Sequence, residues 1–307
     1  MLDTKHNSSY IKGMNKLPLQ KRVMILNMLV EGMSMRSISR TVGVSINTVT
    51  KLLVEAGEAC AAYHDETVRD VKSTKVQCDE IWSFCYAKAK NVETAKAAPE
   101  GAGDVWTWTA LDADSKMILS YEVGDRSAAT AIEFMDDLRA RLANRVHLTT
   151  DGHKAYLEAV EGAFGADIDF AQLVKMYGDT GHKTPERKYS PGVCTGARKM
   201  RIEGDPDISA ISTSHVERQN LSMRMGMRRF TRLTNGFSKK IENHLHMLSL
   251  YFVHYNFVRI HKTLKMSPAM AAGVSDTLRD MEWIVSLIDA RAPKLGRRGS
   301  YKKRNSN

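Results

Sequence analysis

The chain has 307 residues, 43% of them apolar, so it can bury an ordinary core and is neither fibrous nor unfolded as a whole. Forty-five Lys and Arg outweigh 35 Asp and Glu, and the net charge of +10 favours a polyanionic partner such as nucleic acid. The four cysteines form no CxxC pair, which argues against a zinc site and for free thiols in a reducing compartment. We find neither an apolar run of roughly 20 residues nor a signal-peptide core, so we expect a cytoplasmic protein without membrane contact.

Residues 17–57 carry the start and stop signals of three helices. Ser34 can cap a second short helix, Gly43 supplies a tight turn, and Ser45 can cap a third helix. Apolar residues occupy the positions at which two helices of a helix-turn-helix must pack: Ile38, Val42, Val44, Val49 and Leu52. Four polar residues of the third helix remain free to face the major groove of DNA: Asn47, Thr48, Thr50 and Lys51. A small helical bundle without a DNA role is the alternative interpretation.

Residues 61–74 are polar and lack a sustained apolar stripe, so we predict a linker there. It would join a helix-turn-helix domain, residues 1–60, to a catalytic domain, residues 75–265. The patterns that follow are three strands, a helix, a strand, a helix and a strand, at 76–87, 105–113, 117–123, 128–143, 146–151, 155–165 and 168–178. This order is the one expected for an α/β fold with an RNase H-like mixed sheet flanked by helices.

Three acidic residues stand in separate settings: Asp79 in VQCDEIWSF, Asp151 in VHLTTDGHKAY and Glu217 in STSHVERQN. The first two interrupt or close apolar strand patterns, where a carboxylate costs on the order of several kcal/mol unless it is paired or binds a cation. Three converging carboxylates would also repel one another, and a pair of hard divalent ions relieves that repulsion. The sequence therefore predicts metal-dependent phosphoryl chemistry.

The same residues carry a family resemblance. The D, D, E set, the strand order and the stretches DEIWSF, TTDGHKAY and HVERQN resemble bacterial DDE transposases of the insertion-sequence-one type, over roughly residues 75–265. The resemblance implies that Asp79 bridges two Mg²⁺ or Mn²⁺ ions, while Asp151 binds one ion and Glu217 the other. The cysteine spacing of the zinc finger found at the N-terminus of many members is missing, and only the helix-turn-helix is recognisable.

The resemblance also implies the partners. They are double-stranded DNA, both the terminal repeats of the element and the target, bound by a homo-oligomer of at least two subunits in the bacterial cytoplasm at the nucleoid. The implied reaction is hydrolysis at the element ends followed by attack of the freed 3′-hydroxyls on target DNA. A structure-specific nuclease or resolvase with the same carboxylates, and a non-catalytic helix-turn-helix repressor, are the alternatives.

Other polar residues surround the three acids. Glu80 points to the opposite face of the strand from Asp79, so it is expected to contact the metal ligands and not the metal itself. His153 could position a phosphate or relay a proton, with a surface or capping role as the alternative. His215 is expected to orient the nearby metal ligand Glu217. Two rival acids occupy a DADS stretch that indicates an ordinary turn: Asp112 and Asp114.

Glu217 opens a helical pattern whose other charges are basic. Projection at about 100° per residue places Asn220, Arg224 and Arg228 within about 60° of Glu217, on a face separate from the apolar one. With Arg218, these three residues are predicted to contact the phosphate backbone of DNA. A solvated basic helix is the alternative interpretation.

The remaining segments are read from composition and periodicity. Residues 238–260 form a long amphipathic pattern, which we expect in the core, and residues 266–290 form a C-terminal helical segment. Residues 178–209 are rich in Gly, Pro and charge, which predicts an insertion or active-site loop. Residues 291–307 are basic without any acid and predict a disordered tail.

Overall fold

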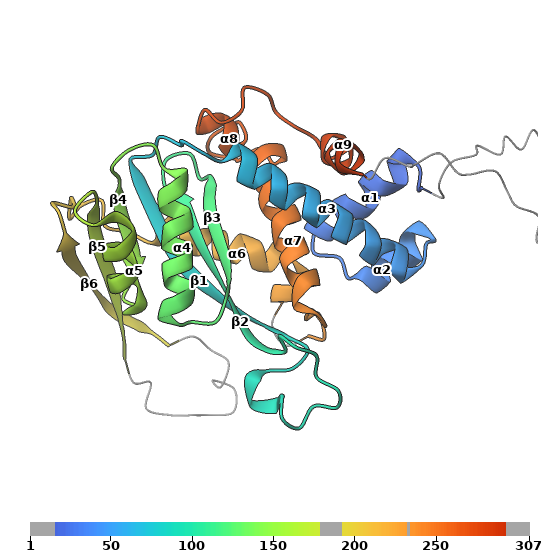
Figure 1. The fold of residues 1–307 in the computed structure, drawn as a ribbon, viewed down its shortest axis with the longest axis horizontal. Coiled ribbons are helices and arrows are strands. Elements are labelled where there is room, and N and C mark those ends of the chain that lie inside the picture. Colours follow the sequence, from blue (N-terminus) through green and yellow to red (C-terminus); the bar gives the residue numbers. More distant parts are fainter. Residues whose placement is uncertain (1–15, 179–191, 232–233, 293–307) are drawn as a thin grey trace, which may run out of the picture.

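The computed structural model describes residues 16–178, 192–231 and 234–292 (Figure 1). The basic tail from residue 293 onward and residues 179–191 of the predicted insertion lie outside this range. A six-stranded sheet in the order β3-β2-β1-β4-β5-β6 forms the centre of the fold. Its strands are β1 Lys75–Cys85, β2 Gly103–Asp112, β3 Ile118–Gly124, β4 His147–Asp151, β5 Asp169–Tyr177 and β6 Cys194–Glu203.

The direction of the strands is mixed. Strands β1, β2 and β3 are antiparallel neighbours, β4 and β5 run parallel to β1, and β6 returns antiparallel to β5. The RNase H-like sheet predicted from the sequence is therefore present, with β6 added at one edge. Strand β6 lies within the segment predicted as a loop. That prediction was wrong because most β6 side chains are exposed, so no apolar alternation marks the strand.

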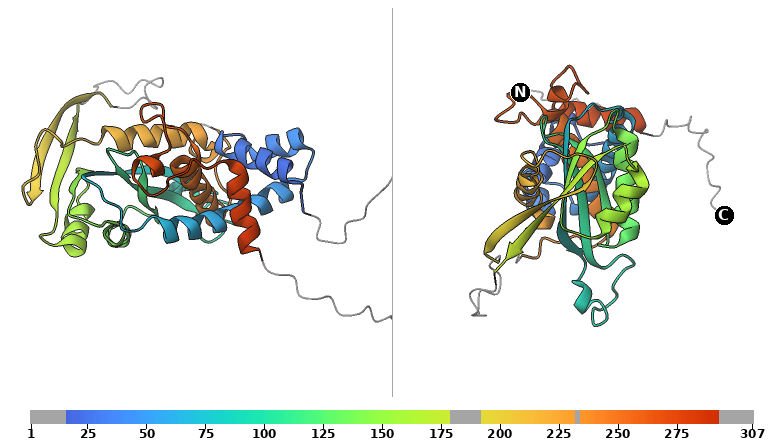
Figure 2. Two further views of the ribbon diagram at one scale, coloured as in Figure 1. Left: turned by 90° about the horizontal axis from the view of Figure 1, so that it is seen from above. Right: turned by 90° about the vertical axis from the view of Figure 1, so that its left-hand side faces the viewer.

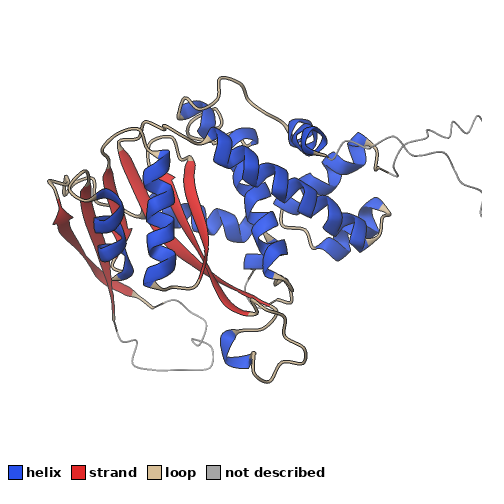
Figure 3. Cartoon of the chain, in the orientation of Figure 1, coloured by secondary structure: helices blue, strands red, loops and turns tan. Residues whose placement is uncertain are grey.

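Helices cover both faces of the sheet (Figures 2 and 3). Helices α4 (Ala128–Arg141) and α5 (Ala155–Phe164) lie on one face, and α6 (Ser214–Gly226) crosses the other. Trp108 of β2 is completely buried under the first pair, with its ring 5.3 Å from that of Tyr156 on α5. Burial on both faces explains why the central strands read as nearly continuous apolar runs.

Three helices precede the sheet: α1 Leu19–Val30, α2 Met35–Val42 and α3 Ile46–Thr67. The predicted caps are confirmed, because the hydroxyls of Ser34 and Ser45 accept hydrogen bonds from the third backbone N–H that follows each. Gly43 adopts φ 70°, a left-handed conformation that costs glycine little. The use of these helices in reading DNA stays a prediction.

Helix α3 continues to Thr67, so the predicted linker is wrong for residues 61–67. The second half of α3 packs against α7 (Ile241–Val253). At Gly57 a side chain would place its Cβ only 2.4 Å from Cα of His246, so this crossing requires glycine. The N-terminal helices and the sheet thus contribute to one hydrophobic core.

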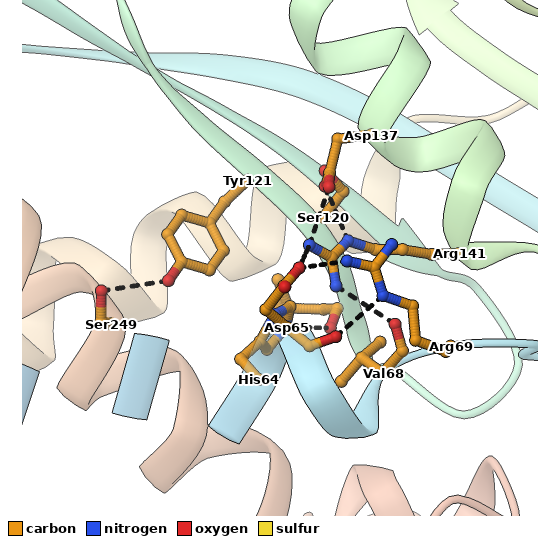
Figure 4. A network of polar contacts seen from close by, with 10 residues as sticks. His64, Asp65, Val68, Arg69, Ser120, Tyr121, Asp137, Arg141 and Ser249 are labelled. Carbon is orange, nitrogen blue, oxygen red and sulfur yellow. Dashed lines mark hydrogen bonds and ion pairs between the residues drawn. The ribbon is translucent and has the colours of Figure 1, made fainter. Parts of the chain in front are cut away.

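Part of the contact between α3 and the sheet layer is polar, so an apolar sequence pattern does not predict it. Figure 4 shows this network of polar contacts. Arg141 of α4 is almost fully buried and donates from Nε to Asp137 at 2.6 Å and from Nη2 to Asp65 of α3 at 3.0 Å. Its Nη1 donates to the backbone oxygen of Val68 at 3.1 Å, and Ser120 of β3 donates to Asp137 at 2.5 Å. A buried guanidinium is tolerated only with such partners, so these polar residues are part of the fold and not of a linker.

The C-terminal helices pack against α3. Helix α7 continues as the π-helical turn η4 (His254–Val258), followed by α8 (Pro268–Ala271) and α9 (Met281–Arg291). The predicted core pattern is confirmed at Leu248, Phe252 and Tyr255, whereas Leu245 is 38% exposed. Trp283 of α9 contacts Tyr63 of α3, with ring centroids 4.9 Å apart. Among the helices within the described ranges, none is long and apolar enough to cross a membrane.

Candidate functional site

Three carboxylates meet where β1 and β4 part. The two strands pair only over residues 75–77 and 147–149, and β4 then ends at Asp151 while β1 continues. Each of Asp79, Glu80 and Asp151 offers one oxygen, and these three atoms lie within 4.8 Å of one another. The predicted convergence of Asp79 and Asp151 is thus present, whereas their role in catalysis stays a prediction.

Glu80 belongs to this cluster, although the sequence predicts it only as a supporting residue. Its side chain is 1% exposed. Nη2 of Arg126 donates to Glu80 at 3.1 Å and to Asp151 at 3.3 Å, and the guanidinium lies 4.9 Å from the centre of the Trp106 ring. The other carboxylate oxygen of Glu80 is buried and accepts no hydrogen bond of good geometry in the described part of the chain, although the Tyr156 hydroxyl is close enough to act on the pKa of Glu80.

Burial and mutual repulsion disfavour the charged forms of these acids. Burial raises the pKa of Asp79 to about 7, and the charge of Asp151 adds to the rise. Burial likewise raises the pKa of Glu80 to about 8, again with help from Asp151, and Arg126 only partly opposes it. At neutral pH the cluster therefore favours binding of a proton or of an additional cation.

Helix α6 is fastened to the sheet next to this cluster. Gln77 of β1 accepts hydrogen bonds from the backbone N–H groups of His215 and Val216, at 2.9 and 3.2 Å. Both N–H groups belong to the first turn of the helix, which has no partners of its own. Asn220, farther along α6, donates to Asp79 at 2.7 Å. Two buried amide side chains of the chain thus fix α6 against the strand that carries Asp79.

Glu217 lies beside the cluster but not within it. It accepts hydrogen bonds from Lys175 of β5 and from the Thr213 hydroxyl. Its charge contributes to the raised pKa of Asp79, which places the two carboxylates within electrostatic reach. The predicted set of three metal ligands is thus assembled only in part, and the role of Glu217 stays a prediction.

The predicted DNA-contacting face of α6 needs two corrections. Asn220 is only 5% exposed and faces Asp79, so it is not part of an exposed basic face. Arg228 is exposed but lies beyond the helix, which ends at Gly226. A side chain at Gly226 would meet the Tyr251 ring at 2.7 Å, so the end of α6 is pressed against α7 and the projected face does not continue.

Arg218 and Arg224 do lie on α6. Arg218 is exposed, and Arg224 is half-buried. Contact of Arg218, Arg224 and Arg228 with DNA stays a prediction.

The two histidines do not contact the carboxylates through their rings. The backbone N–H of His153 donates to Asp151 at 2.9 Å, while its ring Nδ1 accepts from the N–H of Ala155 at 3.1 Å and caps α5. This contact fits the capping alternative, and a role of His153 with phosphate or protons stays a prediction. The His215 ring lies 3.3 Å from the Lys116 ammonium, and its role in orienting Glu217 stays a prediction.

The DADS turn is confirmed as structural. Asp112 is buried and accepts hydrogen bonds from the Ser73 hydroxyl at 2.6 Å and the backbone N–H of Ser115 at 2.9 Å. Asp114 is exposed and accepts from the Thr74 hydroxyl. Neither carboxylate belongs to the cluster at the end of β4.

The start of α3 presents fewer free groups than predicted. Asn47 and Lys51 are exposed, and Lys51 lies 3.7 Å from Glu55. The Thr48 hydroxyl shares a hydrogen bond with that of Ser45 at 2.9 Å, and the Thr50 hydroxyl donates to the backbone oxygen of Ile46 at 3.0 Å. Base contacts by the four residues stay a prediction. Asn47 and Lys51 suit it best, because their side chains are exposed.

The donor set fits a hard divalent cation. Three carboxylate oxygens converge, and one oxygen each of Glu80 and Asn220 is buried without a hydrogen bond of good geometry among the described residues. Oxygen donors of this kind are the ligands that Mg²⁺ and Mn²⁺ prefer. Sequence reasoning missed Gln77, Arg126 and Lys175, since each acts through contacts between distant segments that no local pattern marks.

Comparisons with known proteins do not assign this chain to a family. No protein family model matches the chain, and no curated protein does. Three solved complexes align with it. The Mos1 transposase paired-end complex with the left transposon end is 15% identical over 49% of this chain and 59% of that chain, with a TM-score of 0.20, and the pre-cleavage Mos1 transpososome is 14% identical over 52% and 61%, also with a TM-score of 0.20. The Mos1 strand transfer complex is 12% identical over 78% of each chain, with a TM-score of 0.21. The chain thus spans about three fifths of the length of the first two, and values this low carry no argument for function.

Proposed function

We propose that this protein is a transposase of the insertion-sequence-one type, which cuts DNA at element ends and joins the freed 3′-hydroxyls to target DNA with the help of two Mg²⁺ or Mn²⁺ ions. One observation carries the proposal. Carboxylates from β1 and β4 converge where these two central strands of an RNase H-like sheet part, and Glu217 of α6 lies within electrostatic reach of them. The net charge of +10 supports a nucleic-acid substrate.

The side chains of this site have distinct tasks under the proposal. Asp79, Asp151 and Glu217 hold the ions, which when bound supply Lewis-acid stabilisation of charge on the reacting phosphate. Asn220 fixes the orientation of Asp79 through a 2.7 Å hydrogen bond. Lys175 neutralises Glu217 in the metal-free protein. The hydrogen bond from Asn220 orients Asp79 before DNA arrives, which lowers the cost of organising that ligand during the reaction.

DNA would be held at two places. The exposed Asn47 and Lys51 at the start of α3 are suited to the major groove, and Arg218 and Arg224 of α6, with Arg228 just beyond it, supply positive charge for phosphates. Joining two element ends needs two active sites, so we also propose at least a dimer on DNA.

The decisive experiment provides the substrates for both cleavage and joining. The purified full-length chain is incubated with Mg²⁺, a target plasmid and labelled duplexes taken from the DNA that flanks the coding sequence, which are the candidate element ends. Joined products are expected. Cleavage without joining would identify a nuclease or resolvase, and binding without either reaction would leave a repressor.

A further inference from the structure

We propose that Glu80 is itself a ligand of a divalent cation, which it shares with Asp79 and Asp151. In the metal-free protein Arg126 holds the place of this cation and is displaced when the metal binds. The inference deepens the proposed function and rests on it for the chemistry that the ion serves. The binding of the ion can be measured without DNA.

The end of β4 is what brings Glu80 into the site. Side chains of adjacent strand residues point to opposite faces, so Asp79 faces α6 while Glu80 lies on the side of α4 and α5. Because β4 stops at Asp151, nothing separates the two faces there, and one oxygen of each residue lies within 4.8 Å of the others. Oxygens that bind one Mg²⁺ or Ca²⁺ at about 2.0–2.6 Å are about 3–5 Å apart, so one ion can contact all three carboxylates.

The unpaired oxygen of Glu80 is a second, independent observation. The side chain is 1% exposed, and its second oxygen accepts no hydrogen bond of good geometry within the described residues. Its neighbour is the Tyr156 hydroxyl, which is also buried without a partner of good geometry. A buried carboxylate that served only the fold would form a full hydrogen bond with this hydroxyl, since leaving both groups poorly paired is costly. A cation at the cluster supplies the missing interaction.

Arg126 has the position and the freedom of a temporary occupant. A single nitrogen, Nη2, donates to both Glu80 and Asp151, so one point of positive charge lies between the two carboxylates. A permanent structural pair would more commonly use two parallel hydrogen bonds to one carboxylate. The Arg126 side chain is 38% exposed and its guanidinium lies over Trp106, so it can leave the carboxylates without losing every contact.

Binding of Mn²⁺ to the full-length protein, followed by electron paramagnetic resonance, tests the ligand role. Glu80→Gln keeps the size of the side chain and an acceptor for Arg126, and it is expected to weaken Mn²⁺ binding at least tenfold. The matched control is Glu122→Gln, which changes a half-buried glutamate of β3 that bonds to the N–H of Val123, and it should bind as the wild type does. Thermal unfolding in chelator establishes that both variants are folded.

Asp79→Asn separates failure of this inference from failure of the proposed function. If Asp79→Asn loses Mn²⁺ while Glu80→Gln binds it with wild-type affinity, Glu80 is not a ligand and the proposed function stands. If the wild type binds no Mn²⁺, with or without DNA, both proposals are wrong.

A second variant tests displacement. Arg126→Gln removes the competing charge and is expected to tighten Mn²⁺ binding several-fold. Weaker binding in Arg126→Gln would show that Arg126 supports the bound ion and would overturn the displacement step.

Discussion

Asp79, Glu80 and Asp151 gather three carboxylates around one point at the end of β4, and the fold only partly compensates the charge they carry when ionised. Arg126 contacts two of them, and Lys175 is occupied by Glu217. Protein interiors accept such a concentration of like charge at functional sites, where a ligand later balances it. The structure therefore carries, at residue scale, a cost that binding of a cation would remove.

This cost makes a prediction for the pH dependence of stability. The pKa of Glu80 rises from 4.5 to about 8 on folding, so between these values the folded protein binds more protons than the unfolded one. Stability contributed by this group is present below about pH 4.5 and is lost as the pH rises toward 8. In chelator, Glu80→Gln should gain on the order of 1–3 kcal/mol over the wild type at pH 8 and little at pH 5, because coupled acids share the shift.

Denaturant unfolding at several pH values measures this difference, and Glu133→Gln, at an exposed position of α4, controls for loss of a carboxylate. Parallel curves for the wild type and Glu80→Gln would show that Glu80 is not strained in the folded protein.

The proposed metal ligands give a second prediction at this scale. Replacing Asp79, Asp151 or Glu217 by Ala should lower cleavage at least about 1000-fold, equivalent to about 4 kcal/mol of barrier, while DNA affinity is unchanged or higher. Single-turnover cleavage of labelled ends and filter binding measure the two quantities. Asp114→Asn changes an exposed turn carboxylate and should keep full activity. A variant that cleaves at the wild-type rate would remove its residue from the site.

At the scale of elements, local chemistry explains what the sequence predicts and long-range contacts explain what it does not. Ser34, Gly43 and Ser45 mark helix ends because caps and turns are local. The second half of α3 escapes prediction because its polar residue Asp65 is matched by an arginine 76 residues away. Strand β6 escapes it because an exposed edge strand has no apolar alternation. In the candidate site, the acids on strands could be found from pattern, but the contacts of Arg126 could not.

The attachment of α6 gives a prediction for an element. Gln77→Ala removes the acceptor for two N–H groups at the start of α6, which should cost about 1–3 kcal/mol of stability. Cleavage should fall about 10–100-fold, since a displacement of Glu217 by about 1 Å misplaces a reacting group. Affinity of the three-carboxylate cluster for Mn²⁺ should persist, because Asp79 remains on β1. Wild-type stability in Gln77→Ala would mean that Gln77 does not anchor the helix.

At the scale of the whole molecule, one hydrophobic core joins the N-terminal helices to the sheet. Helix α3 has 22 residues and is therefore about 33 Å long, with its start beside α2 and its end beside the sheet (Figure 1). The crossing at Gly57 and the Arg141–Asp65 ion pair hold its second half in place. The two proposed DNA-contacting regions thus lie at fixed, separate places on one body, which allows one to read sequence while the other holds phosphates.

This separation predicts two kinds of binding defect. Asn47→Ala and Lys51→Ala should reduce the preference for element ends over random duplex, by about 1–3 kcal/mol per lost base contact, because both side chains are exposed at the start of α3. Arg218→Gln should weaken binding to both duplexes equally and lower the salt slope by about one unit, as expected for one lost phosphate contact. Lys72→Gln, an exposed lysine between α3 and β1, controls for loss of a charge. Titrations of both duplexes from low to high salt distinguish these effects, and an equal loss on both duplexes for Asn47→Ala would count against base reading by α3.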